Sequence, residues 1–267
     1  MELLVDGRRA YAYTGGKPFD PTLPCIVFVH GALNDHSVWT LLARWFAHHG
    51  HAVLALDQPG HMRSEGPLLD SVEALADWVV RVLDAAGVAR ATVAGHSMGS
   101  LIGLEAAARH PARVERLLML GTAYPMKVSP ALLQAAEQQP AAGMAQVNAF
   151  SHAGWAAKPG YPGPGSWLHG GGLALMAQVQ AHGPAGANVF RHDFGLCNAY
   201  AHGLEAAAAV QCPAHLVLGS ADVMTPARAT RELAQALRAR VHTVPAGHAL
   251  MQEQPDAVLA ALRAACA

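Results

Sequence analysis

A serine stands between two glycines in the pattern Gly95-x-Ser97-x-Gly99. The pattern follows a short apolar run at residues 91–94 and precedes a stretch of helical periodicity. A turn between strand and helix at this point must be tight, so only small neighbours fit, and the serine hydroxyl projects above the edge of a sheet. The backbone N–H of Met98, at the start of the helix, faces a developing negative charge. The pattern alone is weak, but in this context it predicts Ser97 as a nucleophile.

A serine hydroxyl is a feeble nucleophile near neutral pH and needs a base within hydrogen-bond reach. The chain has 16 histidines, and position selects His248, because it follows the last predicted strand at the same sheet edge as Ser97. His96 is adjacent to Ser97, but its side chain cannot readily fold back onto the hydroxyl. His30 ends a strand beside a glycine and is better interpreted as bracing a loop. The sequence therefore predicts His248 as the base.

The base needs an acceptor for its second ring nitrogen, which fixes the tautomer and stabilises the imidazolium. Asp222 lies just past a predicted strand and before a helix that starts with proline. A helix cap or turn is the alternative role for such an aspartate. The order Ser97, Asp222, His248 is the one expected for a triad of this kind, and the segment after the strand at 117–120 contains no carboxylate. Asp222 is therefore the predicted acid.

The remaining requirement is a second donor for an oxyanion. His30-Gly31-Ala32-Leu33 ends the first core strand, and the Ala32 N–H is the candidate partner of the Met98 N–H. The alternative is an ordinary turn at the end of a strand. We predict Ala32 and Met98 as the oxyanion hole.

Short apolar runs alternate with helical stretches through most of the chain, which is typical of a parallel sheet covered by helices on both faces. The first dozen residues, around Asp6-Gly7, predict a β-hairpin. The predicted strands are 25–29, 52–56, 91–94, 117–120, 215–218 and 241–244. The predicted helices are 37–49, 72–86, one that ends near 109, 226–238 and one that starts near 255.

The alternation stops between residues 124 and 202, a stretch rich in Ala, Gly, Pro and His. It is too long for a plain connection, so we predict a cap or lid inserted into a core domain of residues 1–123 and 203–267. Its few charged residues favour a neutral or apolar substrate. The residues predicted to line a substrate pocket are Leu33, Tyr124, Met126, Phe150, Trp155 and Trp167.

Composition excludes several classes of function. The formal net charge of -1 gives no electrostatic footprint for nucleic acid or anionic lipid. The four cysteines are scattered, which favours buried thiols over a disulfide framework or a zinc site. His48, His49 and His51 cluster near a predicted helix end, where interaction with the helix dipole is a simpler interpretation than a metal site. Without a signal peptide or an apolar run that could cross a bilayer, we expect a cytoplasmic protein with no metal and no cofactor.

Taken together, these residues resemble the α/β-hydrolase superfamily over essentially the whole chain. The matching motifs are His30-Gly31, Asp57 to Ser64, Gly95 to Gly99, Gly219 to Asp222 and Gly247-His248. The resemblance implies a serine hydrolase with a cap and an esterase-like triad, and it implies that the Asp57 to Ser64 segment is a structural turn.

Two positions depart from the pattern of the superfamily. Met62 and Ser100 stand where glycine is common, and both concern packing. Subfamilies similar to haloalkane dehalogenases or epoxide hydrolases would carry aspartate in place of Ser97, so we do not expect their chemistry.

The expected substrate is a small neutral or apolar carboxylic ester. Several alternatives stay open: a hydrolase of carbon–carbon bonds in diketones, a lactonase, a thioesterase, an amidase and a cofactor-free perhydrolase. A ligand receptor with slow turnover is the alternative from a different class. We expect a small-molecule partner, and no feature of the sequence indicates an oligomeric state.

Overall fold

The computed structural model describes residues 1–267 and is built on one eight-stranded sheet. The strand order is β1-β2-β4-β3-β5-β6-β7-β8, in which β1 and β2 pair antiparallel, β2 pairs antiparallel to β4, and all other pairs are parallel. The strands are β1 Glu2–Val5, β2 Arg8–Tyr13, β3 Cys25–Val29, β4 Ala52–Leu56, β5 Ala91–His96, β6 Val114–Leu120, β7 Ala214–Gly219 and β8 Arg240–Val244.

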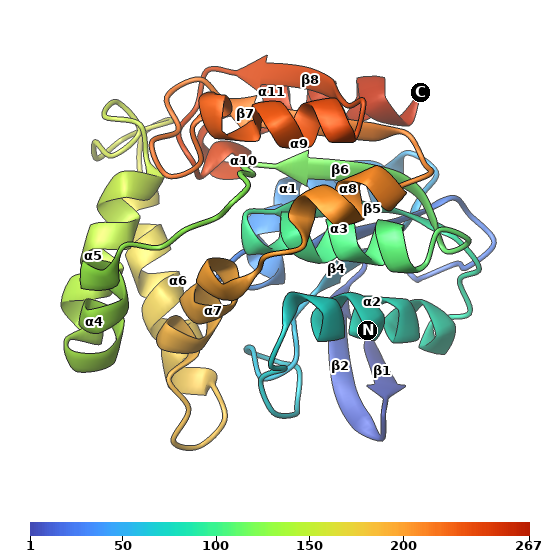
Figure 1. Ribbon diagram of the computed structural model, residues 1–267, viewed down its shortest axis with the longest axis horizontal. Coiled ribbons are helices and arrows are strands. Elements are labelled where there is room, and N and C mark those ends of the chain that lie inside the picture. The colour runs from blue at the N-terminus through green and yellow to red at the C-terminus, as the bar shows by residue number, and fades with distance from the viewer.

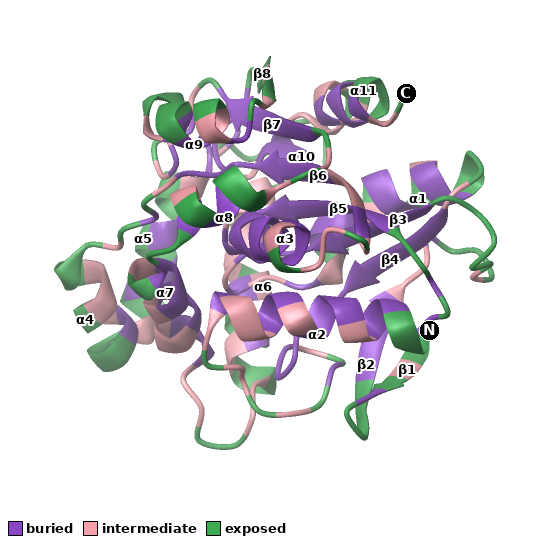
Figure 2. Cartoon of the chain, turned by 45° about the vertical axis from the view of Figure 1, so that its right-hand side comes forward, coloured by how far each residue is buried: buried purple, intermediate pink, exposed green.

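The central strands are buried along their whole length because helices cover both faces of the sheet. Alternate residues of β3 point to opposite sides: Val27 and Val29 join one apolar core, and Ile26 and Phe28 join the other. Helices α2, α3 and α8 pack in the first core, and α1 and α11 in the second. Figure 2 shows the buried residues on the sheet and on the helix faces that meet it. These helices are α1 Thr40–His48, α2 Val72–Ala85, α3 Met98–Arg109, α8 Gly203–Ala209 and α11 Pro255–Cys266.

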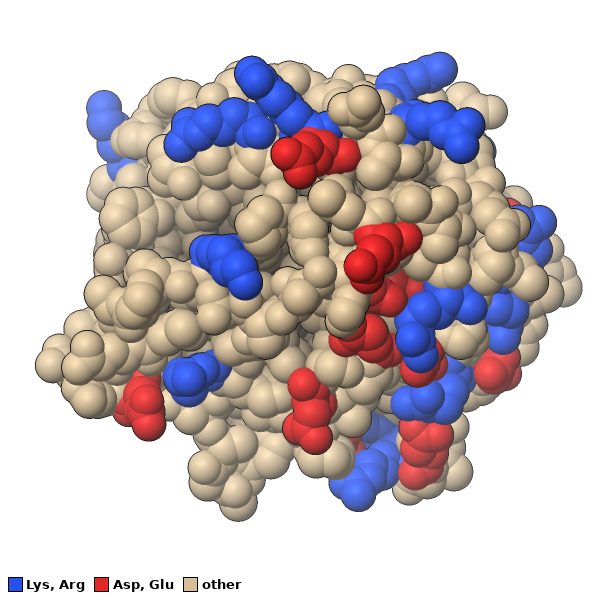
Figure 3. Space-filling view, viewed as in Figure 1, with Lys and Arg blue, Asp and Glu red and all other residues tan.

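Four helices between β6 and β7 form a separate layer at the carboxyl ends of the strands. They are α4 Pro130–Gln138, α5 Pro140–Ser151, α6 Leu168–His182 and α7 Val189–Ala199. In Figure 1 the arrowhead of β6 points toward the side on which they lie. Their apolar side chains make a small core of their own, which includes Met144, Val179 and Phe190. The part of the surface that they form carries few charged side chains in Figure 3.

The predicted fold class is confirmed, and the structure refines several boundaries. The four helices fall within residues 124–202, and the division of the chain into a core domain and a cap stays a prediction. The helix predicted over 226–238 is shorter: a 3₁₀ turn at Ala227–Thr230 precedes α9 Arg231–Ala236. The buried Thr230 hydroxyl donates to the Ala227 carbonyl at 2.8 Å within that first turn. A further short helix, α10 Leu250–Glu253, was not predicted.

None of the helices combines the length and the apolar character that crossing a bilayer requires.

Candidate active site

Ser97 occupies a strained turn between β5 and α3. Its backbone lies at φ 52° and ψ -120°, a conformation that non-glycine residues rarely adopt and that marks functional sites. A side chain at Gly95 would collide with the backbone of Gly99, and one at Gly99 would collide with the carbonyl of Val29. The two glycines of the motif are therefore needed for close approach. The hydroxyl of Ser100 donates to the Ser97 carbonyl at 2.5 Å, so the serine that departs from the family pattern braces the turn.

His248 and Asp222 form a buried pair. The Nδ1–H of His248 donates to Oδ2 of Asp222 at 2.8 Å. This bond places the ring proton on Nδ1 and leaves Nε2 free to accept a proton. Burial opposes ionisation of Asp222, but the neighbouring His248 and hydrogen bonds from Thr225 outweigh it and hold the pKa of Asp222 well below its usual range. Asp222 is therefore a carboxylate at neutral pH.

Thr225 is a polar neighbour of this pair that was not among the residues predicted from the sequence. Its hydroxyl donates to Oδ2 of Asp222 at 2.6 Å, and its backbone N–H donates to Oδ1 at 2.8 Å. The same hydroxyl oxygen lies 3.1 Å from Nδ1 of His248. The spacing of Asp222 and Thr225, three residues apart in a turn, is the signal that could have revealed it.

His96 contacts the main chain of His248. Its Nε2–H donates to the His248 carbonyl at 2.9 Å, and the two ring centroids lie 4.8 Å apart. Burial lowers the pKa of His96 to about 3, with the nearby His248 as a second cause, so the ring stays neutral. The residue next to the serine thus ties the turn at Ser97 to the loop that carries His248. Nothing in the sequence alone indicates this role for His96.

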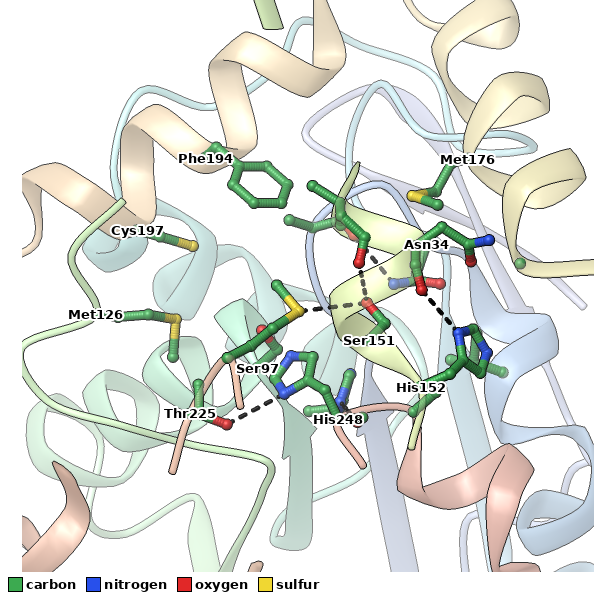
Figure 4. Close-up of a pocket in the computed structure, with 18 of the residues that line it drawn as sticks. Asn34, Ser97, Met126, Ser151, His152, Met176, Phe194, Cys197, Thr225 and His248 are labelled. Carbon is green, nitrogen blue, oxygen red and sulfur yellow. Dashed lines mark hydrogen bonds between the residues drawn. The ribbon is translucent and has the colours of Figure 1, made fainter. Parts of the chain in front are cut away.

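Ser97 and His248 line one cavity at the carboxyl ends of the strands, beneath α5, α6 and α7. Figure 4 shows the two side chains close together, with Thr225 beside His248. The cavity, its mouth included, encloses about 900 Å³. Much of its lining is apolar and comes from Val38, Met126, Val128, Val147, Met176, Phe194, Met224 and Met251.

The structure corrects the predicted pocket residues. Met126 lines the cavity, whereas the other five lie elsewhere. Leu33 is fully buried in the core of the α4–α7 layer, and Tyr124 packs against Tyr200. Phe150, Trp155 and Trp167 lie at the surface, with exposed fractions of 51%, 45% and 55%.

The phase of α5 explains one of these misplacements. Val147, Asn148, Ser151 and His152 share the face of the α5 region that lines the cavity. Phe150 falls between these positions in the sequence and points to another side of the helix. Apolar character alone was therefore a poor guide to the pocket lining.

The predicted oxyanion donors, Ala32 and Met98, both have backbone N–H groups without an acceptor in the chain. Ala32 lines the cavity, and its backbone N–H makes no hydrogen bond within the protein. Met98 is the first residue of α3, where a helix leaves its N–H without an intrahelical acceptor. The turn at Gly31 packs closely against Ser97, because a Cβ at Gly31 would lie 3.0 Å from the Ser97 Cβ.

A buried ion pair links this turn to α7. Oδ2 of Asp193 accepts the Leu33 N–H at 2.9 Å and contacts Nε2 of His61 at 3.0 Å. Nδ1 of His61 faces the Pro59 carbonyl at 3.1 Å, so both ring nitrogens face acceptors, an arrangement that favours the imidazolium. Burial disfavours both charges, but each partner outweighs it: the pKa of His61 is raised, and the pKa of Asp193 is lowered.

One group of side chains has the residue types of a metal site. The ligand atoms of Asp35, His36 and Asp57 lie within 4.8 Å of one another. Oδ1 of Asp35 accepts the Ser37 N–H at 2.8 Å, and Oδ1 of Asp57 accepts from both the backbone and the ring of His36, at 2.9 and 2.7 Å. These internal bonds give the segment after β4 a structural role.

Comparison with known proteins agrees with the geometry. Residues 24–160 match the family described as alpha/beta hydrolase fold, and the chain belongs to that family. A putative non-heme haloperoxidase of Mycobacterium phage D29 is 36% identical over 122 residues, which cover 45% of this chain and 42% of that protein. A putative carbamate hydrolase RutD of Caulobacter is 28% identical over 218 residues, 79% of this chain and 78% of that protein.

Several of these curated relatives align over less than half of their own length, as with the phage protein at 42%. Among solved structures, the enol-lactonase of Burkholderia xenovorans superposes with a TM-score of 0.81 at 23% identity, covering 100% of this chain and 99% of that one. The esterase EaEST of Exiguobacterium antarcticum gives 0.83 at 14% identity, with 99% and 98% covered. At these identities the likeness concerns the fold.

Proposed function

We propose that the chain is a serine hydrolase of small neutral or apolar carboxylic esters, with Ser97 as nucleophile, His248 as base and Asp222 as the acid that orients it. The observation that carries the proposal is the strained turn at Ser97, which opens into the same cavity as a histidine whose second nitrogen is held by a buried carboxylate. Such a turn stores strain that a purely structural serine does not need.

The mechanism follows from these positions. The Ser97 oxygen attacks the acyl carbon while Nε2 of His248 takes the hydroxyl proton. The carbonyl electrons move to an oxyanion, which the N–H groups of Ala32 and Met98 stabilise. The imidazolium then gives its proton to the leaving oxygen, which departs as the alcohol. Water, deprotonated by His248, attacks the acyl-enzyme, and the collapse releases the acid and restores Ser97.

The lining of the cavity supports a neutral substrate. No Asp, Glu or Arg lines the cavity, and Lys127 is the one lysine that does. Its ammonium donates to the Asn198 carbonyl at 3.0 Å. A carboxylate or phosphate would gain little in such a site, because burying a charge without a partner is costly.

Kinetics with p-nitrophenyl esters of graded chain length test the proposal. Ser97→Ala should fold as the parent protein does and lower kcat by several orders of magnitude, and Asp222→Asn should lower it about 10⁴-fold because the wrong tautomer of His248 results. Near-full activity of Ser97→Ala rejects the mechanism. A burst of product followed by negligible turnover indicates a ligand receptor, and matched lactone, thioester, amide and diketone substrates decide which bond is cleaved.

A further inference from the structure

Two polar side chains near the carboxyl end of α5 line the cavity with atoms that no group in the protein satisfies. Asn148 is 1% exposed, and its Oδ1 receives no hydrogen bond from the chain. His152 is 8% exposed, and its Nε2 is buried without a partner. Buried polar atoms are nearly always hydrogen-bonded, so the unpartnered Nε2 of His152, next to an Asn148 Oδ1 that accepts no hydrogen bond, points to a ligand at this wall of the cavity.

The chemistry of their partners fixes which atoms are left over. The Asn148 amide nitrogen donates to the His169 carbonyl at 2.7 Å, and Nδ1–H of His152 donates to the Asn148 carbonyl at 2.9 Å. A carbonyl only accepts, so the Asn148 amide group donates with one of its two N–H groups and the His152 ring donates with its one N–H. The atoms that remain, Oδ1 of Asn148 and Nε2 of the neutral imidazole, are both acceptors. Burial lowers the pKa of His152, which keeps this ring neutral.

Asn34, in the turn after β3, repeats the arrangement. Its amide nitrogen donates to the Ala32 carbonyl at 3.0 Å, which leaves Oδ1 as the free atom, and the residue lines the same cavity. Figure 4 draws Asn34 and His152 on the same side of the pocket, with Met126 and Cys197 on the other. We call Asn34, Asn148 and His152 the acceptor wall.

A glycine keeps part of the acceptor wall uncovered. Gly172 of α6 lines the cavity, and a Cβ at this position would lie 2.6 Å from Oδ1 of Asn148 and 3.4 Å from Cε1 of His152. Any larger residue would therefore crowd Oδ1 of Asn148 and touch the ring of His152. The space beside these atoms exists because this position lacks a side chain.

We propose that the acceptor wall binds a hydroxyl or an amide N–H of the substrate, so that the preferred ester carries a hydrogen-bond donor away from the scissile bond. This inference rests on the function proposed for Ser97 and names its substrate class. A substrate with an ether or a carboxylate at that place would set lone pairs against lone pairs and leave the buried acceptors unpaired, which is costly.

Matched p-nitrophenyl esters measure the preference. One set carries a terminal hydroxyl, methoxy or methyl group on the acyl chain, and a second set carries an acylamino group or its N-methyl counterpart. The hydroxyl and N–H esters should exceed their methylated counterparts in kcat/KM by at least about 10-fold, because a site built for a donor rejects the analogue that lacks it. Whichever set shows the preference identifies the donor. Equal or higher kcat/KM for both methylated counterparts overturns the proposal.

Variants assign the preference to these residues. In Asn148→Leu and His152→Phe the ratio of kcat/KM between hydroxyl and methoxy esters should fall to near 1. His182→Phe is the matched control, because Nδ1 of His182 makes the same bond to a carbonyl four residues earlier, at 2.8 Å, on the exposed side of α6. Its ratio should equal that of the parent protein. Asn34 is only partly buried, so Asn34→Leu provides the test if the two α5 variants do not fold.

The two proposals fail in different ways. If the parent protein hydrolyses none of these esters, the function proposed for Ser97 is wrong. If it hydrolyses them with a hydroxyl-to-methoxy ratio near 1, or if the ratio survives in all the variants of the acceptor wall, only the substrate class is wrong.

Discussion

The backbone N–H of Leu33 donates to the carboxylate of Asp193 at 2.9 Å across a separation of 160 residues. This bond joins the turn after β3 to α7. Because it takes up the Leu33 N–H, the neighbouring N–H of Ala32, which lines the cavity and has no partner in the protein, is the one left as a candidate donor. The position of the proposed oxyanion donor thus depends on a helix from the layer above the sheet.

Asp193→Ala should therefore damage both stability and catalysis. We expect a loss of about 3–5 kcal/mol in the free energy of unfolding, because His61 loses its buried partner. In the fraction that folds, kcat should fall about 10-fold or more, with a smaller change in KM, because an oxyanion donor acts mainly in the transition state. Urea unfolding and steady-state kinetics measure the two effects. An unchanged kcat would show that the Leu33 bond does not position the site.

The buried pair of His61 and Asp193 predicts that the free energy of unfolding is highest at an intermediate pH. The pKa of Asp193 is lowered, so its contribution is present above the unfolded-state value and is lost as the pH falls through the folded-state value. The pKa of His61 is raised above its ordinary 6.5, so its contribution is present below that value and is lost as the pH rises through the folded-state value. Free energies of unfolding measured from pH 2 to 9 should begin to decline below about pH 4 on the acid side and should also decline on the alkaline side. In the double variant His61→Leu/Asp193→Leu the free energy of unfolding should depend less steeply on pH on both sides. A pH dependence as steep as that of the parent protein would show that this pair does not cause it.

His96 is expected to position His248. His96→Phe removes the bond to the His248 carbonyl, and we expect kcat to fall about 10-fold with little change in KM, since a small misplacement of a catalytic group is costly. His96→Gln retains an N–H donor and should recover part of the loss. Equal kcat in the parent and in His96→Phe would assign His96 a packing role only.

Gly99, in the turn at Ser97, and Gly154, in the segment after α5, differ sharply in what a methyl group would meet. At Gly99 a Cβ collides with the carbonyls of Val29 and His30, whereas at Gly154 nothing lies within 4 Å. Gly99→Ala should lower Tm by several degrees and abolish most ester hydrolysis, because backbone atoms cannot yield as a flexible side chain does. Gly154→Ala should change neither. Thermal unfolding and kcat/KM, measured side by side, compare the two.

Much of the fold follows from local sequence patterns. The apolar runs of β3, β4, β5 and β7 identify a buried parallel sheet because each is short and bounded by turn residues. Ser97, Asp222 and His248 could be selected because each follows a strand, and the carboxyl ends of parallel strands share one edge.

The rest depends on contacts that no local pattern encodes. The bond between Leu33 and Asp193 joins distant segments, and the direction of the His96 side chain follows from the path of the His248 loop. Phe150 was misplaced because its direction depends on the phase of α5, which is set by packing against α4 and α6. His152 carried no sequence signal at all among 16 histidines.

Four thioethers, from Met126, Met176, Met224 and Met251, line the cavity. Methionine is unbranched and flexible, so such a surface adapts to its guest rather than imposing one outline. Chain length and branching of the acyl group should thus matter little to this protein. Any sharp selectivity has to come from its few polar atoms, and changing those few atoms is the shortest route to a different specificity.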